Sequence, residues 1–104
     1  MRTLEFSVKS QKLRRASSSS FSNIVRGSKN FLKAIFSFSD EWASMNKVVL
    51  FSTDKCKEYV ALRNNECMIP DKITESLVFK VRVIGVNGDQ KVSTTELTIR
   101  QEDA

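Results

Sequence analysis

Residues 31–42, "FLKAIFSFSDEW", decide the fold of this chain. Within this stretch Phe36 and Phe38 occupy alternate positions, with serine between and after them. Alternate residues of a β-strand share one face of a sheet, so a period of two predicts a strand that directs both rings into a core. The next two residues, Asp40 and Glu41, would point to opposite faces if the strand continued, and they are predicted to be solvated at the strand end.

Six further runs show the same period of two and are rich in valine, isoleucine, threonine and phenylalanine, as strands prefer. Several short strands separated by turns predict an all-β fold, an antiparallel β-sandwich of about seven strands or a small barrel. The length of 104 residues predicts a single domain over residues 1–104. The runs are TLEFSVK (3–9), KVVLFS (47–52), EYVAL (58–62), ECMI (66–69), LVFKVRVIGV (77–86) and VSTTELTIR (92–100).

Turn signals lie between these runs. RNNE (63–66) can close a hairpin through its two asparagines, because asparagine tolerates positive φ. NGDQ (87–90) contains Asn-Gly, a strong short hairpin signal. PDKITESL (70–77) predicts one helical turn with Pro70 at its first position, and little other helix is expected.

The charge is concentrated at the start of the chain. Residues 1–33 contain eight Lys and Arg against one Glu, a net charge of +7, whereas residues 34–104 contain nine basic and eleven acidic residues, a net charge of −2. Such asymmetry predicts that the first third meets an acidic partner, either nucleic acid or a protein surface. The candidate contact residues are Arg14, Arg15, Arg26 and Lys29.

A basic N-terminal segment and a Ser-rich loop are predicted at 10–23, around the tract ASSSSFSN (16–23). Such a tract is typical of a flexible loop or hinge. It also fits a segment that becomes ordered only against a partner. The sequence favours the flexible loop or hinge.

The residues that enzymes need are scarce. The chain has no histidine and three scattered glycines, so it lacks both the commonest general base and a phosphate-binding Gly-rich loop. We therefore predict no enzymatic activity, no catalytic residue, no cofactor and no metal site. Cys56 and Cys67 are predicted to be unpaired, because the start of the chain lacks a secretory signal and indicates folding in a cytoplasm. No apolar run approaches the roughly 20 residues that cross a bilayer, so no membrane contact is predicted.

Four segments occur in an informative order: SKNFLKAIFSFSDEW (28–42), KVVLFS (47–52), ECMIP (66–70) and VFKVRVIGV (78–86). In this order and spacing they resemble the immunoglobulin-like β-sandwich module of virion structural proteins in phages of Gram-positive bacteria. The resemblance covers residues 1 to about 100. The matching positions are Ser28, Asn30, Phe31, Leu32, Phe36, Phe38, Glu41, Trp42, Phe51, Cys67, Ile69, Pro70, Val81, Val83 and Gly85.

The resemblance implies a non-enzymatic structural protein of the virion, synthesised in the cytoplasm of a bacterial host. Its expected role is capsid decoration, the base of a head fibre, or an adaptor of the tail or baseplate. Its expected partners are other virion proteins, such as the major capsid protein or a tail protein, contacted in a symmetric oligomeric assembly.

Four residues of these segments are expected to determine the fold together with Phe36 and Phe38. Trp42 is expected to cap the core at a strand end, and Cys67 to fill a small apolar site as an inert thiol. Pro70 is expected to end its strand, and Gly85 to permit a bulge or a tight crossing.

A second function class remains open, a small basic nucleic-acid-binding protein. Phe21, Phe31 and Phe36 lie among basic residues, and binders of single strands use aromatic rings as stacking platforms beside a basic groove. The alternation around Phe36 favours a core position for that ring, so nucleic acid is the less favoured partner.

Overall fold

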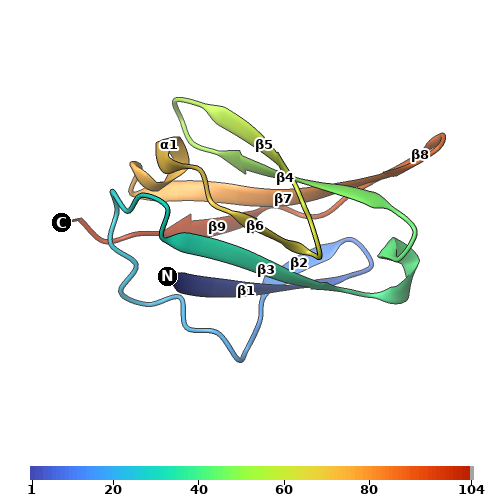
Figure 1. The fold of residues 1–104 in the computed structure, drawn as a ribbon, viewed down its shortest axis with the longest axis horizontal. Helices are drawn as coiled ribbons and strands as arrows, with labels where there is room; N and C mark the ends of the chain where they lie inside the picture. Colours follow the sequence, from blue (N-terminus) through green and yellow to red (C-terminus); the bar gives the residue numbers. More distant parts are fainter. Residues whose placement is uncertain (104) are drawn as a thin grey trace.

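The computed structural model describes residues 1–103, which form nine strands, one turn of α-helix and a short 3-10 helix (Figure 1). The elements are β1 (Arg2–Lys9), β2 (Lys12–Arg15), β3 (Leu32–Phe38), η1 (Asp40–Trp42), β4 (Asn46–Ser52), β5 (Lys57–Ala61), β6 (Glu66–Met68), α1 (Asp71–Thr74), β7 (Val78–Asn87), β8 (Gln90–Ser93) and β9 (Leu97–Arg100).

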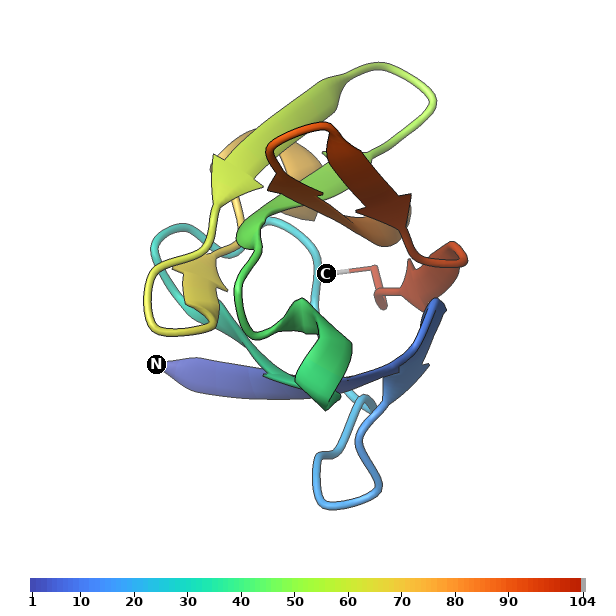
Figure 2. The same cartoon turned by 90° about the vertical axis from the view of Figure 1, so that its right-hand side faces the viewer.

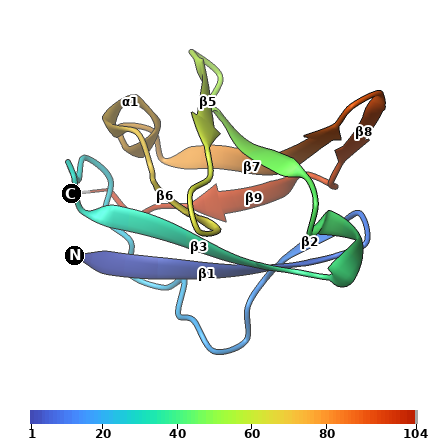
Figure 3. The ribbon, with the colours of Figure 1, turned by 45° about the vertical axis from the view of Figure 1, so that its right-hand side comes forward.

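The strands form two sheets that pack face to face (Figures 2 and 3). One sheet has the order β2-β1-β3-β6, and the other has the order β5-β4-β7-β8, with β9 also paired to β7. The predicted all-β sandwich is therefore confirmed. The pairing is not purely antiparallel, because β1 and β3 run parallel, with Phe6 opposite Phe36. The segment after β2 returns the chain to the end where β1 begins, so β3 starts beside the start of β1 (Figure 1).

Two strands exceed the predicted number of about seven. The first is β2, which lies within the segment 10–23 that the sequence assigned to a loop. Ser10 has a φ of 53°, and the chain turns there so that Leu13 pairs opposite Val8 of β1. Leu13 is the only buried residue of β2, and the three cations around it hide the alternation that would reveal a strand.

The second extra strand appears because the run 92–100, predicted as one strand, contributes to two strands, β8 and β9. Both pair with the same edge of β7. Ser93 of β8 lies opposite Ile84, and Leu97 of β9 lies opposite Val81. Two residues of β7 therefore face three residues between β8 and β9, which is a β-bulge. Thr94 holds the bulge, because its N–H donates to the Val83 carbonyl and its hydroxyl accepts from the Val83 N–H, both at 3.0 Å.

The hydrophobic core lies between the two sheets and includes side chains from residues 31–42, the aromatic stretch from which the sandwich was predicted. Phe36 is 2% exposed, and its ring stacks on Phe6 with 4.9 Å between centroids. Phe38 is half-buried and lies 6.0 Å from Phe36 and 5.4 Å from Trp42. The buried apolar side chains are Leu4, Phe6, Val8, Leu13, Ile24, Leu32, Ala34, Phe36, Trp42, Val49, Phe51, Ile69, Ile73, Phe79, Val81, Val83 and Ile99.

Trp42 closes one end of this core from η1. It is 1% exposed, and its indole N–H donates to the Ser10 carbonyl at 2.7 Å. Gly85 of β7 lies against it, since a Cβ added there would fall 2.7 Å from Met45 Sδ and from Trp42 Cζ3. Gly85 keeps regular pairing with β4 and β8, so it permits a close approach of side chains and not a bulge.

The remaining two fold determinants lie around β6. Cys67 is half-buried and pairs opposite Ala34 of β3. Pro70 follows the last contact of this strand, in which the Ile69 N–H donates to the Leu32 carbonyl at 3.0 Å. Pro70 has an extended conformation with ψ of 145° and directly precedes α1, so it stands one position before its predicted place.

Both predicted turns are present, but the first joins strands of different sheets and carries a single antiparallel bridge, between Arg63 and Glu66. Asn64 and Asn65 have φ values of 52° and 60° and connect β5 to β6. The second turn is shifted by one residue from the Asn-Gly pair, because Asn87 is still paired, opposite Gln90. Gly88 is the first turn residue, and its φ of 59° explains the need for glycine.

The Ser-rich segment packs against the body of the chain. The Arg2 guanidinium donates to the carbonyls of Ser20, Ser22 and Asn23 at 3.1, 2.6 and 2.9 Å. Phe21 sets its ring edge against Phe6, with 5.3 Å between centroids. Contacts within the chain therefore hold this loop on the outside of the sandwich.

Candidate functional site

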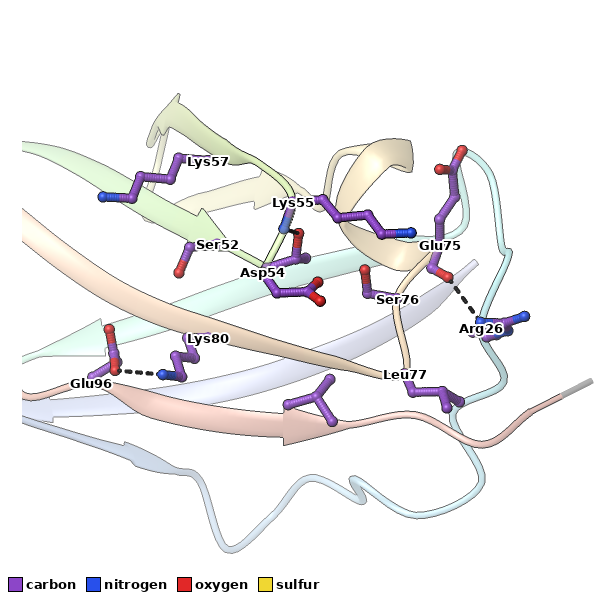
Figure 4. Close-up of a pocket in the computed structure, with 12 residues that line it drawn as sticks. Arg26, Ser52, Asp54, Lys55, Lys57, Glu75, Ser76, Leu77, Lys80 and Glu96 are labelled. Carbon is purple, nitrogen blue, oxygen red and sulfur yellow. Dashed lines mark hydrogen bonds and ion pairs between the residues drawn. The ribbon is translucent and has the colours of Figure 1, made fainter.

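An open groove of about 720 Å³ lies beside the β4–β5 turn (Figure 4). The turn, the end of α1, the start of β7 and the loop before β3 supply its walls. Its lining residues are Arg26, Ser52, Thr53, Asp54, Lys55, Lys57, Glu75, Ser76, Leu77, Val78, Lys80 and Glu96.

Local hydrogen bonds fix the β4–β5 turn at this groove. Thr53 Oγ1 accepts the N–H groups of Lys55 and Cys56, each at 3.1 Å. Lys80 Nζ lies 3.6 Å from Glu96 Oε1 on the opposite wall (Figure 4). The lining thus mixes cations, carboxylates and hydroxyls, an arrangement that suits a polar segment of another molecule better than an apolar ligand.

The structure divides the four predicted contact residues between two places. Arg14 and Arg15 lie on β2, whereas Arg26 and Lys29 lie in the connection to β3. Arg26 Nε is 2.9 Å from Asp103 Oδ1, near the C-terminal end of the described chain. The predicted contact residues therefore come from two different segments of the chain.

Arg15 borders a second groove, which sequence reasoning missed. This groove has a volume of about 530 Å³ and lies between the end of β2 and the outer edge of β9. Its lining residues are Arg15, Phe21, Leu97, Thr98, Ile99 and Arg100. The alternation in residues 92–100 predicted a strand, but only the strand order shows that this strand lies at a sheet edge beside Arg15.

The outer edge of β5 is a third exposed feature. Leu62 N–H donates to the Lys47 carbonyl of β4, so by alternation the backbone groups of Tyr59 and Ala61 point away from β4. The Tyr59 side chain is 63% exposed. An edge of this kind can pair with a strand of another chain.

The three phenylalanines considered for nucleic-acid stacking lie in different environments. Phe36 is buried in the core, so its ring is not a stacking platform. Phe21 is half-buried against Phe6, and Phe31 is 43% exposed. Only Phe31 presents a largely open ring, which does not make a stacking row.

Burial gives Cys67 a distinctive chemistry. It raises the pKa of the Cys67 thiol from 9.0 to about 12. The thiolate is the reactive form, so at pH 8 only about one in 10⁴ of these side chains is reactive. Because the unfolded chain releases this proton near pH 9 and the folded chain only near pH 12, the free energy of unfolding should fall as the pH rises between these values.

We expect the folded Cys56→Ser variant to react slowly with a disulfide reagent at pH 8. Once the variant is unfolded by denaturant, its Cys67 thiol should release one equivalent of the reagent's thiol product per chain. The kinetics of thiol release, followed by absorbance, measure this. A Cys67→Ser variant identifies the contribution of Cys56. Fast, complete labelling of folded Cys56→Ser would contradict the inert role of Cys67.

Residues 1–103 were also compared with what metal binding and membrane spanning require of side chains and helices. No group of three or more His, Cys, Asp and Glu side chains in this range is arranged to hold a metal ion. No helix in this range is long and apolar enough to span a bilayer. Comparison with known proteins gives no match, because no family model, curated protein or solved structure matches the chain.

Proposed function

We propose that this chain is a non-enzymatic structural protein of a phage virion that binds neighbouring virion proteins. Its role would be capsid decoration, the base of a head fibre, or an adaptor of the tail or baseplate. The observation that carries the proposal is the position of the aromatic stretch, because Phe36 lies inside the sandwich, Phe38 packs against its core, and strand edges and cations are left exposed. The resemblance of four segments, in their order along the chain, to the virion module supports the same proposal.

The exposed features suit protein contacts. The outer edges of β5 and β9 offer backbone groups to an added strand. Arg14 and Arg15 provide forked donors for carboxylates of a neighbour. An interface of roughly 800 Å² on each partner is ordinary for a specific contact. Symmetric repetition on a particle multiplies weak contacts into avidity.

Nucleic-acid binding is the competing function. The burial of Phe36 counts against this function, because its ring is not available for stacking. Binding to DNA or RNA would weaken by orders of magnitude between low and physiological salt. A titration with labelled oligonucleotides at both salt concentrations therefore separates the two functions.

Incorporation into particles tests the proposed role. We expect the double variant Arg14→Glu/Arg15→Glu to be incorporated at least about tenfold less than the parent, because two charge-assisted contacts become repulsive. Quantitative mass spectrometry of purified particles measures the copy number. A matched double variant, Arg63→Glu/Lys72→Glu, makes the same charge change at exposed positions elsewhere and should be incorporated normally.

Two results would count against this proposal. Absence of the parent chain from intact virions would exclude the structural role. Equal incorporation of both double variants would exclude β2 as the part of the chain that anchors it.

A further inference from the structure

The outer edge of β9 carries unpaired strand positions. The Gln101 N–H donates to the Leu77 carbonyl at 2.6 Å, so position 101 is hydrogen-bonded towards β7. By alternation in an antiparallel pair, the backbone groups of Thr98 and Arg100 point away from β7. The Thr98 carbonyl confirms this direction, because it accepts from the Arg15 guanidinium at 2.6 Å.

The opposite wall of the groove comes from β2 and the Ser-rich loop. Arg15 is on the same face of β2 as the buried Leu13, so it turns towards the opening between the two sheets. Its guanidinium lies 5.5 Å from the centroid of the Phe21 ring. That ring is fixed against Phe6 in the core. The groove therefore has a backbone edge on one side and an anchored aromatic ring with a cation on the other.

The two edges are joined by backbone hydrogen bonds at both ends of the groove, and between these ends the Arg15 side chain crosses to the Thr98 carbonyl. At one end the Thr95 N–H donates to the Gln11 carbonyl at 2.8 Å. At the other end the Glu102 N–H donates to the Ile24 carbonyl at 2.6 Å. The four residues of β9, Leu97 to Arg100, lie between these contacts and span about 10 Å. The opening is thus long enough for one short extended segment.

The charged side chains that line the opening are positive, so they favour binding of a negatively charged segment. Arg15 and Arg100 both line it. Arg14, at the neighbouring position of β2, is exposed and by alternation points to the opposite face. Glu96, the acid nearest in sequence to β9, lies 3.6 and 3.7 Å from two cations of β7, so its charge is compensated. Carboxylates at alternate positions of an added strand can reach the arginines on this rim.

We propose that the groove between β2 and β9 binds an extended acidic segment of a partner protein by strand addition. The segment accepts hydrogen bonds from the outward N–H groups of Thr98 and Arg100. Arg15 exchanges its bond to the Thr98 carbonyl for a carboxylate of the segment, and the freed carbonyl accepts a backbone N–H. The inference rests on the proposed function in that a neighbouring virion protein would supply the segment.

The probe is a fluorescein-labelled peptide of alternating glutamate and valine, titrated with the full chain while anisotropy is followed. We expect saturable binding, and at least about tenfold weaker binding by Thr98→Pro, which removes one outward N–H and leaves the bonds to β7 intact. Arg15→Glu should weaken binding by at least about tenfold through charge reversal. Amide NMR signals of residues 98–100 should shift as the peptide is added.

Ala61→Pro is the matched control, because it removes an outward N–H from the other exposed edge, on β5. It should bind the peptide like the parent. Circular dichroism checks that each variant is folded. Unchanged binding by both Thr98→Pro and Arg15→Glu would overturn the inference. Equal binding of a peptide with lysine in place of glutamate would also overturn it, as would equal competition by a single-stranded oligonucleotide.

The outcomes separate this inference from the proposed function. A chain that is present in virions but does not bind the acidic peptide retains its proposed role and loses this groove as its contact. A chain that binds the peptide through β9 but is absent from virions retains the groove and loses the role.

Discussion

Replacing Trp42 by alanine should lower the free energy of unfolding by about 3–5 kcal/mol, the usual cost of truncating a large buried aromatic side chain. Trp42 is 1% exposed and closes the end of the core between the two sheets. The substitution leaves a cavity between Phe38, Met45 and Gly85, all of which contact or approach the indole. It also leaves the Ser10 carbonyl without its indole donor. Urea unfolding followed by circular dichroism measures the change.

Trp42→Phe serves as the control for this prediction. It retains an aromatic ring in the cavity and removes the indole N–H, so it should cost less than Trp42→Ala. Fluorescence is not a suitable probe, because Trp42 is the only tryptophan. If Trp42→Ala unfolds at the same urea concentration as the parent, the indole does not close the core.

The period of two was enough to find the strands with several buried residues. Phe36 and Phe38 alternate with polar or smaller residues in β3, and Phe79, Val81 and Val83 do so in β7. The inward direction of such side chains follows from strand geometry alone. Burial therefore followed from local pattern in the strands where apolar and polar residues alternate. In β4 the apolar run Val48 to Phe51 does not define which face is buried.

Three features of the fold depend on contacts between residues distant in sequence, so the local sequence pattern does not predict them. They are strand β2, the bulge between β8 and β9, and the parallel pairing of β1 with β3. Leu13 alone anchors β2, so this strand has no alternation to detect. Thr94 has the side chain of an ordinary strand residue, and the bulge exists because Thr94 bonds to Val83. The parallel pairing of β1 with β3 depends on the path of the whole segment between them.

The same distinction applies to the candidate site. Composition identified Arg14 and Arg15 as contact residues, because charge is visible in the sequence. The groove beside Arg15 is formed by β9, more than 80 residues later in the chain, as the bond from Arg15 to Thr98 shows. Thr98 and Arg100 carry no sequence signal of their own, since their importance comes from lying at an edge of the second sheet.

Replacing Phe36 by alanine is the other substitution with a large expected effect, again about 3–5 kcal/mol of unfolding free energy. Phe36 is 2% exposed and stacks between Phe6 and Phe38, at 4.9 and 6.0 Å between ring centroids. Its removal deprives both neighbours of aromatic contact in the middle of the first sheet. Urea unfolding of the purified variant, compared with the parent under identical conditions, measures the loss.

Phe31→Ala is the matched control, since it makes the same chemical change five residues earlier on a ring that is 43% exposed. It should change the unfolding free energy by less than about 1 kcal/mol. The difference between the two variants tests the assignment of the aromatic stretch to the core. A stable Phe36→Ala that binds neither its partners nor particles would instead place this ring on a binding surface, and the proposed scaffold role would then need a different contact.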